Sequence, residues 1–136
     1  MKQALIIVLA AAFFLGCSDK KAEEKALFDD IIKVHDKVMG ADEQLMKNKM
    51  QLDTIAAQNP MPQIKDSAKI YIKLLNAADA SMENWMHNFN PEYDGKPHDE
   101  VMTYLGKQKT EITGVDTQIQ EAIKKSTSYL AKIKSK

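Results

Sequence analysis

The sequence contains no arginine, only one cysteine and few aromatic residues, and it has no excess of charge of either sign. Its 136 residues include 19 basic residues, all lysines, and 19 acidic ones, so the formal net charge is zero. Nucleic-acid binding proteins normally carry a basic face and use the planar guanidinium of arginine, so we expect no nucleic-acid partner. A single cysteine also excludes a disulfide scaffold and a zinc site built from paired cysteines.

The first sixteen residues have the pattern of a secretory leader. Residues 1–3 provide a short positive start, and residues 4–15 form an unbroken run of twelve apolar residues that ends at Gly16-Cys17. A helix of this length measures about 18 Å, well short of the roughly 30 Å hydrocarbon core of a bilayer. We therefore interpret residues 1–16 as a cleaved signal peptide and not as a membrane span.

Gly16 followed directly by Cys17 resembles the lipobox of bacterial lipoprotein signal peptides. In that family the cysteine receives a diacylglyceryl group, the peptide is cut just before it, and the new amino terminus is usually acylated. The family prefers leucine and then a small residue where this sequence has Phe14 and Leu15. The resemblance implies lipidation at Cys17, and two or three acyl chains anchor a protein persistently. The alternative is a free buried cysteine after a short hydrophobic helix.

Residues 17–26 comprise this cysteine and a polar run of mixed charge with nothing to bury. We expect a flexible tether there, followed by a folded domain over residues 27–136. Ser18 is not the aspartate that keeps lipoproteins at the inner membrane in enteric bacteria. Resemblance to lipoprotein sorting rules therefore favours the outer membrane, facing either the periplasm or the cell surface. The charged residues 19–24 are compatible with surface display as found in some Bacteroidetes.

From Leu27 onward, apolar residues recur at steps of three and four, which is typical of amphipathic helices. The spacing predicts a first helix over about residues 24–58, a second after the break at residues 59–62, and a third that begins near Asp99. The expected core residues are Leu27, Ile31, Val34, Val38, Ala41, Leu45, Leu52, Ile55, Ile64, Ala68, Tyr71, Leu75, Ala78, Met82, Trp85, Phe89, Val101, Leu105, Ile112, Val115, Ile119, Ala122, Tyr129 and Ile133.

No segment alternates polar and apolar residues over the length of a strand. Short connections force neighbouring helices to be antiparallel. The predicted fold is therefore all-α, an antiparallel up-down-up bundle of three long helices. The heptad-like spacing leaves open a homo-oligomer in which two bundles pair through an unused stripe.

Three glycines, Gly40, Gly106 and Gly114, fall inside these predicted helices. Each costs about 1 kcal/mol relative to alanine. A close approach between helices or a local bend would explain them, and the sequence does not distinguish the two.

Three stretches, one in each predicted helix, carry a family resemblance. Residues 34–39 read VHDKVM, residues 77–89 read AADASMENWMHNF and residues 104–109 read YLGKQK. They resemble a family of small Bacteroidetes lipoproteins whose members are often misleadingly called "viral A-type inclusion protein". The Trp-Met-His-Asn-Phe run is the most specific part, and the resemblance spans most of the mature chain. It supports the compartment and the fold, and it implies no activity, because none is established for that family.

Histidine and methionine side chains offer weak candidates for a metal site. His35 lies four residues before Met39, and Met82 and Met86 repeat this spacing, which places each pair on one helical face. Imidazole with thioethers suits copper or haem iron, so a small-molecule or metal-binding bundle is the alternative function. Methionine at helical spacing is more often core filler. We expect no cofactor and no metal, with His35 and Met39 as the weak candidates.

The end of the second predicted helix and the loop after it gather the only tryptophan and several aromatic residues. In one interpretation, Trp85 and Phe89 plug the end of the core. In the other, Trp85, His87, Asn88 and Tyr93 form a docking surface, because rigid aromatic side chains dominate interaction hot spots. His87 lies about 200° around the helix from Trp85, so we expect it to face solvent.

Motifs for catalysis are missing from the sequence. It has no nucleophile elbow or phosphate-binding loop, and acidic neighbours such as Asp29 and Asp30 diverge by about 100° on a helix. We therefore expect that the protein is not an enzyme. The sequence predicts a membrane-anchored envelope lipoprotein, a non-enzymatic structural or partner-binding bundle. Its expected partners are membrane lipid, through acylated Cys17, and an envelope protein.

Overall fold

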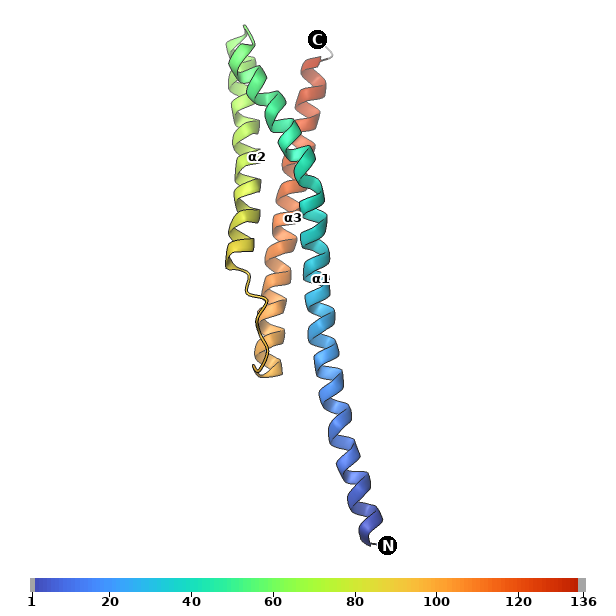
Figure 1. Ribbon diagram of the computed structural model, residues 1–136. Helices are drawn as coiled ribbons and strands as arrows, with labels where there is room; N and C mark the ends of the chain where they lie inside the picture. Colours follow the sequence, from blue (N-terminus) through green and yellow to red (C-terminus); the bar gives the residue numbers. More distant parts are fainter. Residues whose placement is uncertain (1, 135–136) are drawn as a thin grey trace.

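A computed structural model of the chain shows three helices packed side by side, with no strand in the part of the chain that it describes (Figure 1). The backbone is described for residues 2–134 and the side chains for residues 19–134. Helix α1 spans Lys2–Gln58, α2 spans Pro62–Asn88 and α3 spans His98–Lys134. Each helix packs against the other two, which confirms the predicted all-α bundle with up-down-up topology.

The first connection is short because two prolines and an asparagine end one helix and begin the next. Pro62 stands in the first turn of α2, where its missing N–H removes no helical hydrogen bond. The Asn59 side chain accepts a hydrogen bond from the backbone N–H of Met61 at 3.0 Å. These residues turn the chain back within three positions, so α2 runs antiparallel to α1.

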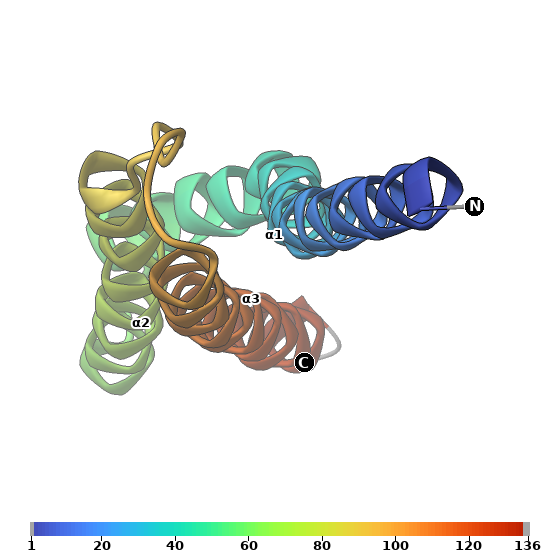
Figure 2. The ribbon, with the colours of Figure 1, turned by 90° about the horizontal axis from the view of Figure 1, so that it is seen from below.

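The second connection, residues 89–97, crosses the other end of the bundle, as the end-on view shows (Figure 2). Gly95 has a φ of 83°, in the left-handed region that favours glycine. Helix α3 then begins with acidic Asp99 and Glu100 in its first turn and ends with Lys132 and Lys134 in its last. This charge order is favourable for the helix dipole.

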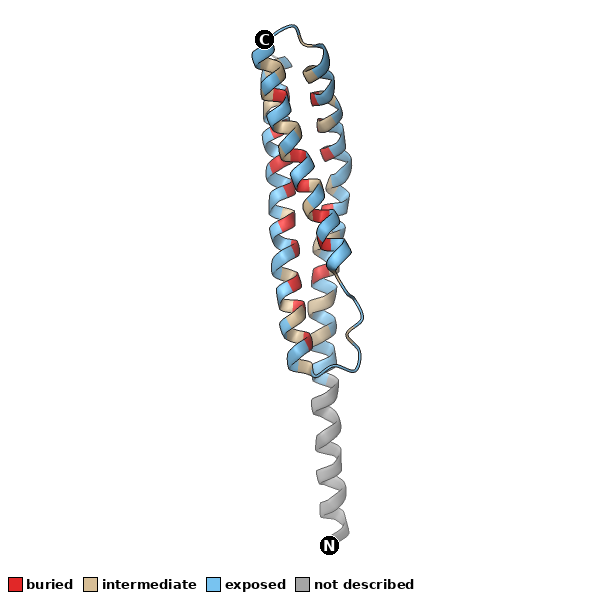
Figure 3. Ribbon diagram, turned by 90° about the vertical axis from the view of Figure 1, so that its left-hand side faces the viewer, coloured by how far each residue is buried: buried red, intermediate tan, exposed pale blue. Residues whose placement is uncertain are grey.

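The core follows the predicted stripes along the inner faces of all three helices (Figure 3). With the exception of Ile64, every residue expected in the core is buried there or packed against it. Three polar residues, Asn48, Gln108 and Ser126, are also buried. They continue the spacing of three and four, as Asn48 does between Leu45 and Leu52, so the seam is longer than its apolar residues alone indicate.

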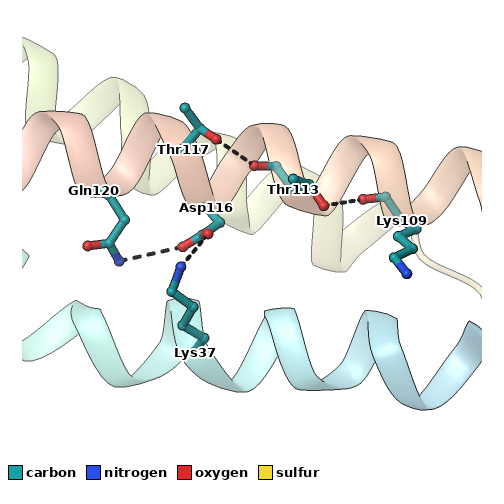
Figure 4. Close-up of polar contacts among 6 residues, drawn as sticks. All are labelled: Lys37, Lys109, Thr113, Asp116, Thr117 and Gln120. Atoms are coloured by element: carbon teal, nitrogen blue, oxygen red, sulfur yellow. Dashed lines mark hydrogen bonds and ion pairs between the residues drawn. The ribbon is translucent and has the colours of Figure 1, made fainter.

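Ion pairs join α1 to α3 along the outside of this seam. Lys37 Nζ lies 2.6 Å from Asp116 Oδ2, and Asp116 also accepts a hydrogen bond from Gln120 (Figure 4). Nearer the second loop, Lys109 Nζ lies 2.5 Å from Asp30 Oδ2. The hydrogen bond from Lys109 lowers the pKa of the Asp30 carboxyl below its ordinary value. The two pairs hold the same register between the two helices.

The segment expected to be a flexible tether is helical instead. Helix α1 has no break before Gln58, so residues 19–26 belong to it. Glu24 Oε1 lies 2.8 Å from His98 Nδ1, and Glu23 Oε2 lies 3.5 Å from His98 Nε2. Lysine, alanine and glutamate are strong helix formers, and their polar side chains reach the start of α3 without burying apolar surface. The composition of residues 19–26 correctly predicted that most of their side chains are exposed, but it did not predict that they are helical.

The predicted signal peptide, residues 1–16, and the predicted lipidation site, Cys17, lie outside the residues whose side chains are described. Among the described residues, no helix has the combination of length and apolarity that crossing a membrane requires.

Candidate functional site

An open groove of about 1280 Å³ lies at the end of the bundle where α1 turns into α2. Helices α2 and α3 supply most of its lining, and Ile55 and Asn59, at and just after the end of α1, line it as well. A second pocket, of about 180 Å³, lies between α1 and α2 and is much smaller. The groove is therefore the larger of these two concave surfaces.

The α2 wall of the groove is mainly apolar, with Gln63 and Ser67 as its polar residues. Ile64, Ile70 and Tyr71 line it together with Met61 at the turn, and Ile70 and Met61 are 67% and 52% exposed. Tyr71 stacks on Tyr129 of α3 with ring centroids 4.6 Å apart, and the Tyr129 hydroxyl donates a hydrogen bond to the Ile64 carbonyl at 3.0 Å. The stacked rings line the groove together with these exposed hydrophobic side chains, which are typical of a binding surface.

The α3 wall is positively charged. Lys124, Lys125, Lys132 and Lys134 line it, and Glu121 is the one acidic residue of the lining. Glu121 forms an i, i+4 ion pair with Lys125 at 3.0 Å. Four lysines and one glutamate give the lining a net charge of +3. A chain that is neutral as a whole thus concentrates positive charge at this end.

The amino terminus of α2 adds to this positive potential. Gln63 and Ile64, in the first turn of α2, line the groove. Within α2, all of which is described, no acidic residue occupies the first turn, and Met61 at the N-cap supplies no capping side chain. The positive end of the helix dipole is therefore not offset by an acidic side chain in the first turn of α2.

The docking surface predicted from the sequence lies at the other end of α2, and its aromatic residues are turned inward. Trp85 is only 6% exposed and stacks on Phe89, with ring centroids 4.7 Å apart. Tyr93 is half-buried, and its ring centroid lies 5.9 Å from that of Phe28. Burial, with a smaller contribution from the charge of Glu24, raises the pKa of the Tyr93 hydroxyl above its ordinary value. These rings close the core, as the plug interpretation expects.

Two members of the predicted docking surface remain accessible. His87 and Asn88 are both exposed, as expected for His87 from its angle to Trp85. The Asn88 side chain donates a hydrogen bond to the Asn84 carbonyl at 2.7 Å. The structure thus separates the four predicted residues into an aromatic pair, with Trp85 buried and Tyr93 half-buried, and an exposed polar pair.

The predicted metal candidates are also separated. The ring of His35 lies against Trp85, with centroids 6.0 Å apart, and His35 does not line the smaller pocket. Met39, 45% exposed, lines that pocket with Met82 and Met86 and with three carboxylates. Among the described residues, no group of three or more histidine, cysteine, aspartate or glutamate side chains is placed to hold a metal ion.

The groove was not predicted from the sequence, although two signals point to it. Ile70 is a large apolar residue beside the core stripe, which passes through Tyr71, and lysines crowd the last turns of α3. In comparisons with protein-family models, with curated proteins and with solved structures, no match to this chain was found. Function is therefore inferred from the residues and their geometry.

Proposed function

We propose that the protein is a lipid-anchored, non-enzymatic helical module of the bacterial cell envelope that offers the groove to a partner. The observation that carries the proposal is the pairing of an exposed apolar wall on α2 with a lysine-rich wall on α3. Solvent-exposed apolar side chains in a concave site favour binding over a purely structural role.

The position of the groove relative to the proposed anchor supports this function. The segment of α1 where the described side chains begin lies beside the second loop, because Lys21 Nζ lies 3.9 Å from Asp94 Oδ1. The groove begins at Glu121, about 35 Å along α3 from His98 at the helix's rise per residue. An acylated Cys17 would hold the loop end at the bilayer and leave the groove at the opposite end of the bundle.

The anchor is tested by Cys17→Ser, with Ser18→Ala as the matched control that keeps the cysteine. We expect the Cys17→Ser protein to lose palmitate labelling and to leave the sedimented membrane fraction, because no acyl chain remains to partition into lipid. The Ser18→Ala protein keeps both properties. A Cys17→Ser protein that still sediments with membranes, or a leader cut at another position, contradicts the anchor.

The groove is tested by crosslinking in living cells. A photoreactive amino acid replaces Ile70, which is 67% exposed in the groove, or Met50, which is 66% exposed on α1 outside it. We expect a discrete adduct from position 70 and none from position 50, because only the first faces the bound partner. Equal labelling from both positions, or none from position 70, contradicts the groove as the binding surface.

A soft metal ion is the second candidate ligand. The observation that favours it is that three thioether side chains line the smaller pocket. Met39, Met82 and Met86 suit copper(I), and neighbouring carboxylates attract a cation. If this pocket is the site, the protein binds one copper(I) ion in a competition titration with a chromogenic chelator, and Met86→Leu abolishes that binding. If the Met86→Leu variant still binds copper(I) stoichiometrically, the metal binds elsewhere. If the original chain binds no copper(I), this candidate is excluded.

A further inference from the structure

We infer that the occupant of the groove is an amphipathic α-helix with an acidic edge, supplied by another protein. This inference rests on the proposed function, because it names the kind of partner that the same groove takes. Three features of the groove carry it, namely its length, the arrangement of its lysines and the different chemistry of its α2 and α3 sides.

The dimensions of the groove fit a helix. Its α3 wall runs from Glu121 to Lys134, which is about 20 Å of helix and matches a partner helix of about 14 residues. A cylinder about 10 Å wide and 20 Å long occupies roughly 1600 Å³. The groove, at about 1280 Å³, can take most of that volume. Pockets for small molecules are usually about 300–1000 Å³ and more enclosed.

The lysines are spread along the groove and not gathered at one point. From Lys124 to Lys134 the helix rises about 15 Å. A fatty acid or another ligand with a single anionic head would reach the lysines at one end of this wall only. Acidic residues spaced three or four apart on a partner helix would follow the wall along its length.

The opposite wall sets the other face of the partner. Ile64, Ile70 and Tyr71 offer apolar contacts along α2, and the lysines lie on the α3 side of the same groove. A helix lying between the walls buries apolar residues at i, i+3, i+4 and i+7 against α2 and directs its acidic edge to α3. Seated there, it becomes a fourth helix of the bundle at this end.

The experiment uses a designed peptide of about 18 residues, with leucine along one face, glutamate along one edge and a fluorescent label. The full chain is held in phosphatidylcholine vesicles, empty vesicles are the blank, and fluorescence anisotropy reports binding. The control peptide has lysine in place of each glutamate. We expect the acidic peptide to bind at least tenfold more tightly than the control, and 0.5 M salt to weaken it, because salt screens exposed charges.

Matched variants tie the binding to the groove. The double variant Lys124→Glu/Lys125→Glu changes the charge by the same amount as Lys47→Glu/Lys73→Glu, whose lysines are exposed outside the groove. We expect the first pair to weaken the acidic peptide at least tenfold and the second less than twofold. Ile70→Glu tests the apolar wall, and we expect it to weaken binding of the acidic peptide at least tenfold as well. Circular dichroism melts show which variants keep the fold.

Several results overturn the inference. Equal affinity for the two peptides excludes an acidic edge, and equal loss in both double variants excludes the groove. If oleate or phosphatidylglycerol vesicles bind with the expected lysine dependence and the peptide does not, the occupant is a lipid. Absence of peptide binding together with an Ile70 crosslink in cells overturns the acidic helix and leaves the proposed function standing. If the peptide does not bind and position 70 gives no crosslink in cells, both the acidic helix and the proposed function are overturned.

Discussion

Asn48 of α1 and Ser126 of α3 form a hydrogen bond inside the core, with Asn48 Nδ2 2.8 Å from Ser126 Oγ. Both side chains are buried, at 2% and 0% exposed. The Asn48 amide also donates to Thr127 Oγ1 at 2.8 Å and accepts from Gln44 Nε2 at 2.7 Å. Both ends of this buried amide are therefore satisfied. A polar residue at one seam position fixes register between helices, at some cost in stability.

Removing this buried network destabilises the bundle. We expect Asn48→Ala to lower the free energy of unfolding by about 1–3 kcal/mol, because the amide is lost and its hydroxyl partners on α3 lose their donor. Urea unfolding followed by circular dichroism measures the change. Lys47→Ala, at the exposed neighbouring position, is the control and stays within about 0.5 kcal/mol of the original chain.

A double-mutant cycle isolates the contact itself. The variants Asn48→Ala and Ser126→Ala, singly and together, yield a coupling free energy between the two side chains. Contacting residues typically couple by about 0.5–3 kcal/mol. Additive losses would mean that the two residues act independently, which contradicts the role of this pair in setting register.

The contrast between Leu45 and Asn48 shows how much of the fold the sequence predicts. Leu45 belongs to an apolar stripe with helical spacing, and such stripes predicted three helices, their breaks and nearly all of the core. Asn48 occupies an equivalent position, yet a polar residue there has no visible reason until Ser126 is opposite it. The missing information is tertiary, because the partner lies 78 residues away along the chain.

The candidate site was harder to predict for the same reason. Ile70 and Lys124 lie on different helices, and only the packed bundle shows that they face one groove. The aromatic cluster around Trp85 was visible in the sequence, but its orientation was not. The hydrogen bond between Glu24 and His98, which joins this part of α1 to the start of α3, likewise depends on two distant segments meeting.

Substitutions at the loop end of α2 distinguish the plug interpretation of the aromatic cluster from the docking interpretation. We expect Trp85→Ala to cost about 3–5 kcal/mol, the usual range for removing a large buried aromatic side chain. His87→Ala, at an exposed position of the same helix, changes stability by less than about 0.5 kcal/mol. Thermal unfolding measures both.

The Tyr93→Ala variant should lose less stability than Trp85→Ala and more than His87→Ala. Its half-buried ring packs on Phe28, so Tyr93→Ala lowers stability by about 1 kcal/mol in addition to the loss of buried area. If Trp85→Ala leaves stability almost unchanged, the cluster is not a plug. Loss of an envelope partner on His87→Ala, with the fold intact, would instead support docking at this end.

Close packing between helices does not explain why glycine occupies three positions inside the helices. Replacing these glycines should therefore stabilise the protein. A Cβ added at Gly40, Gly106 or Gly114 meets no atom within 4 Å. Each replacement by alanine should therefore raise the free energy of unfolding by about 0.5–1 kcal/mol, because alanine restricts the unfolded chain and favours helix. The triple variant gains nearly the sum, since distant sites are additive. Urea unfolding measures the gain.

Gly95→Ala is the opposite control for this series. Its Cβ also meets no atom within 4 Å, but the φ of 83° strains any residue with a side chain, so we expect a loss of stability of about 1 kcal/mol. If the triple alanine variant were less stable than the original chain, a contact made at one of the helical glycines must be lost. Because the free bundle leaves all three positions open, that contact would come from a second molecule, such as another copy of the chain.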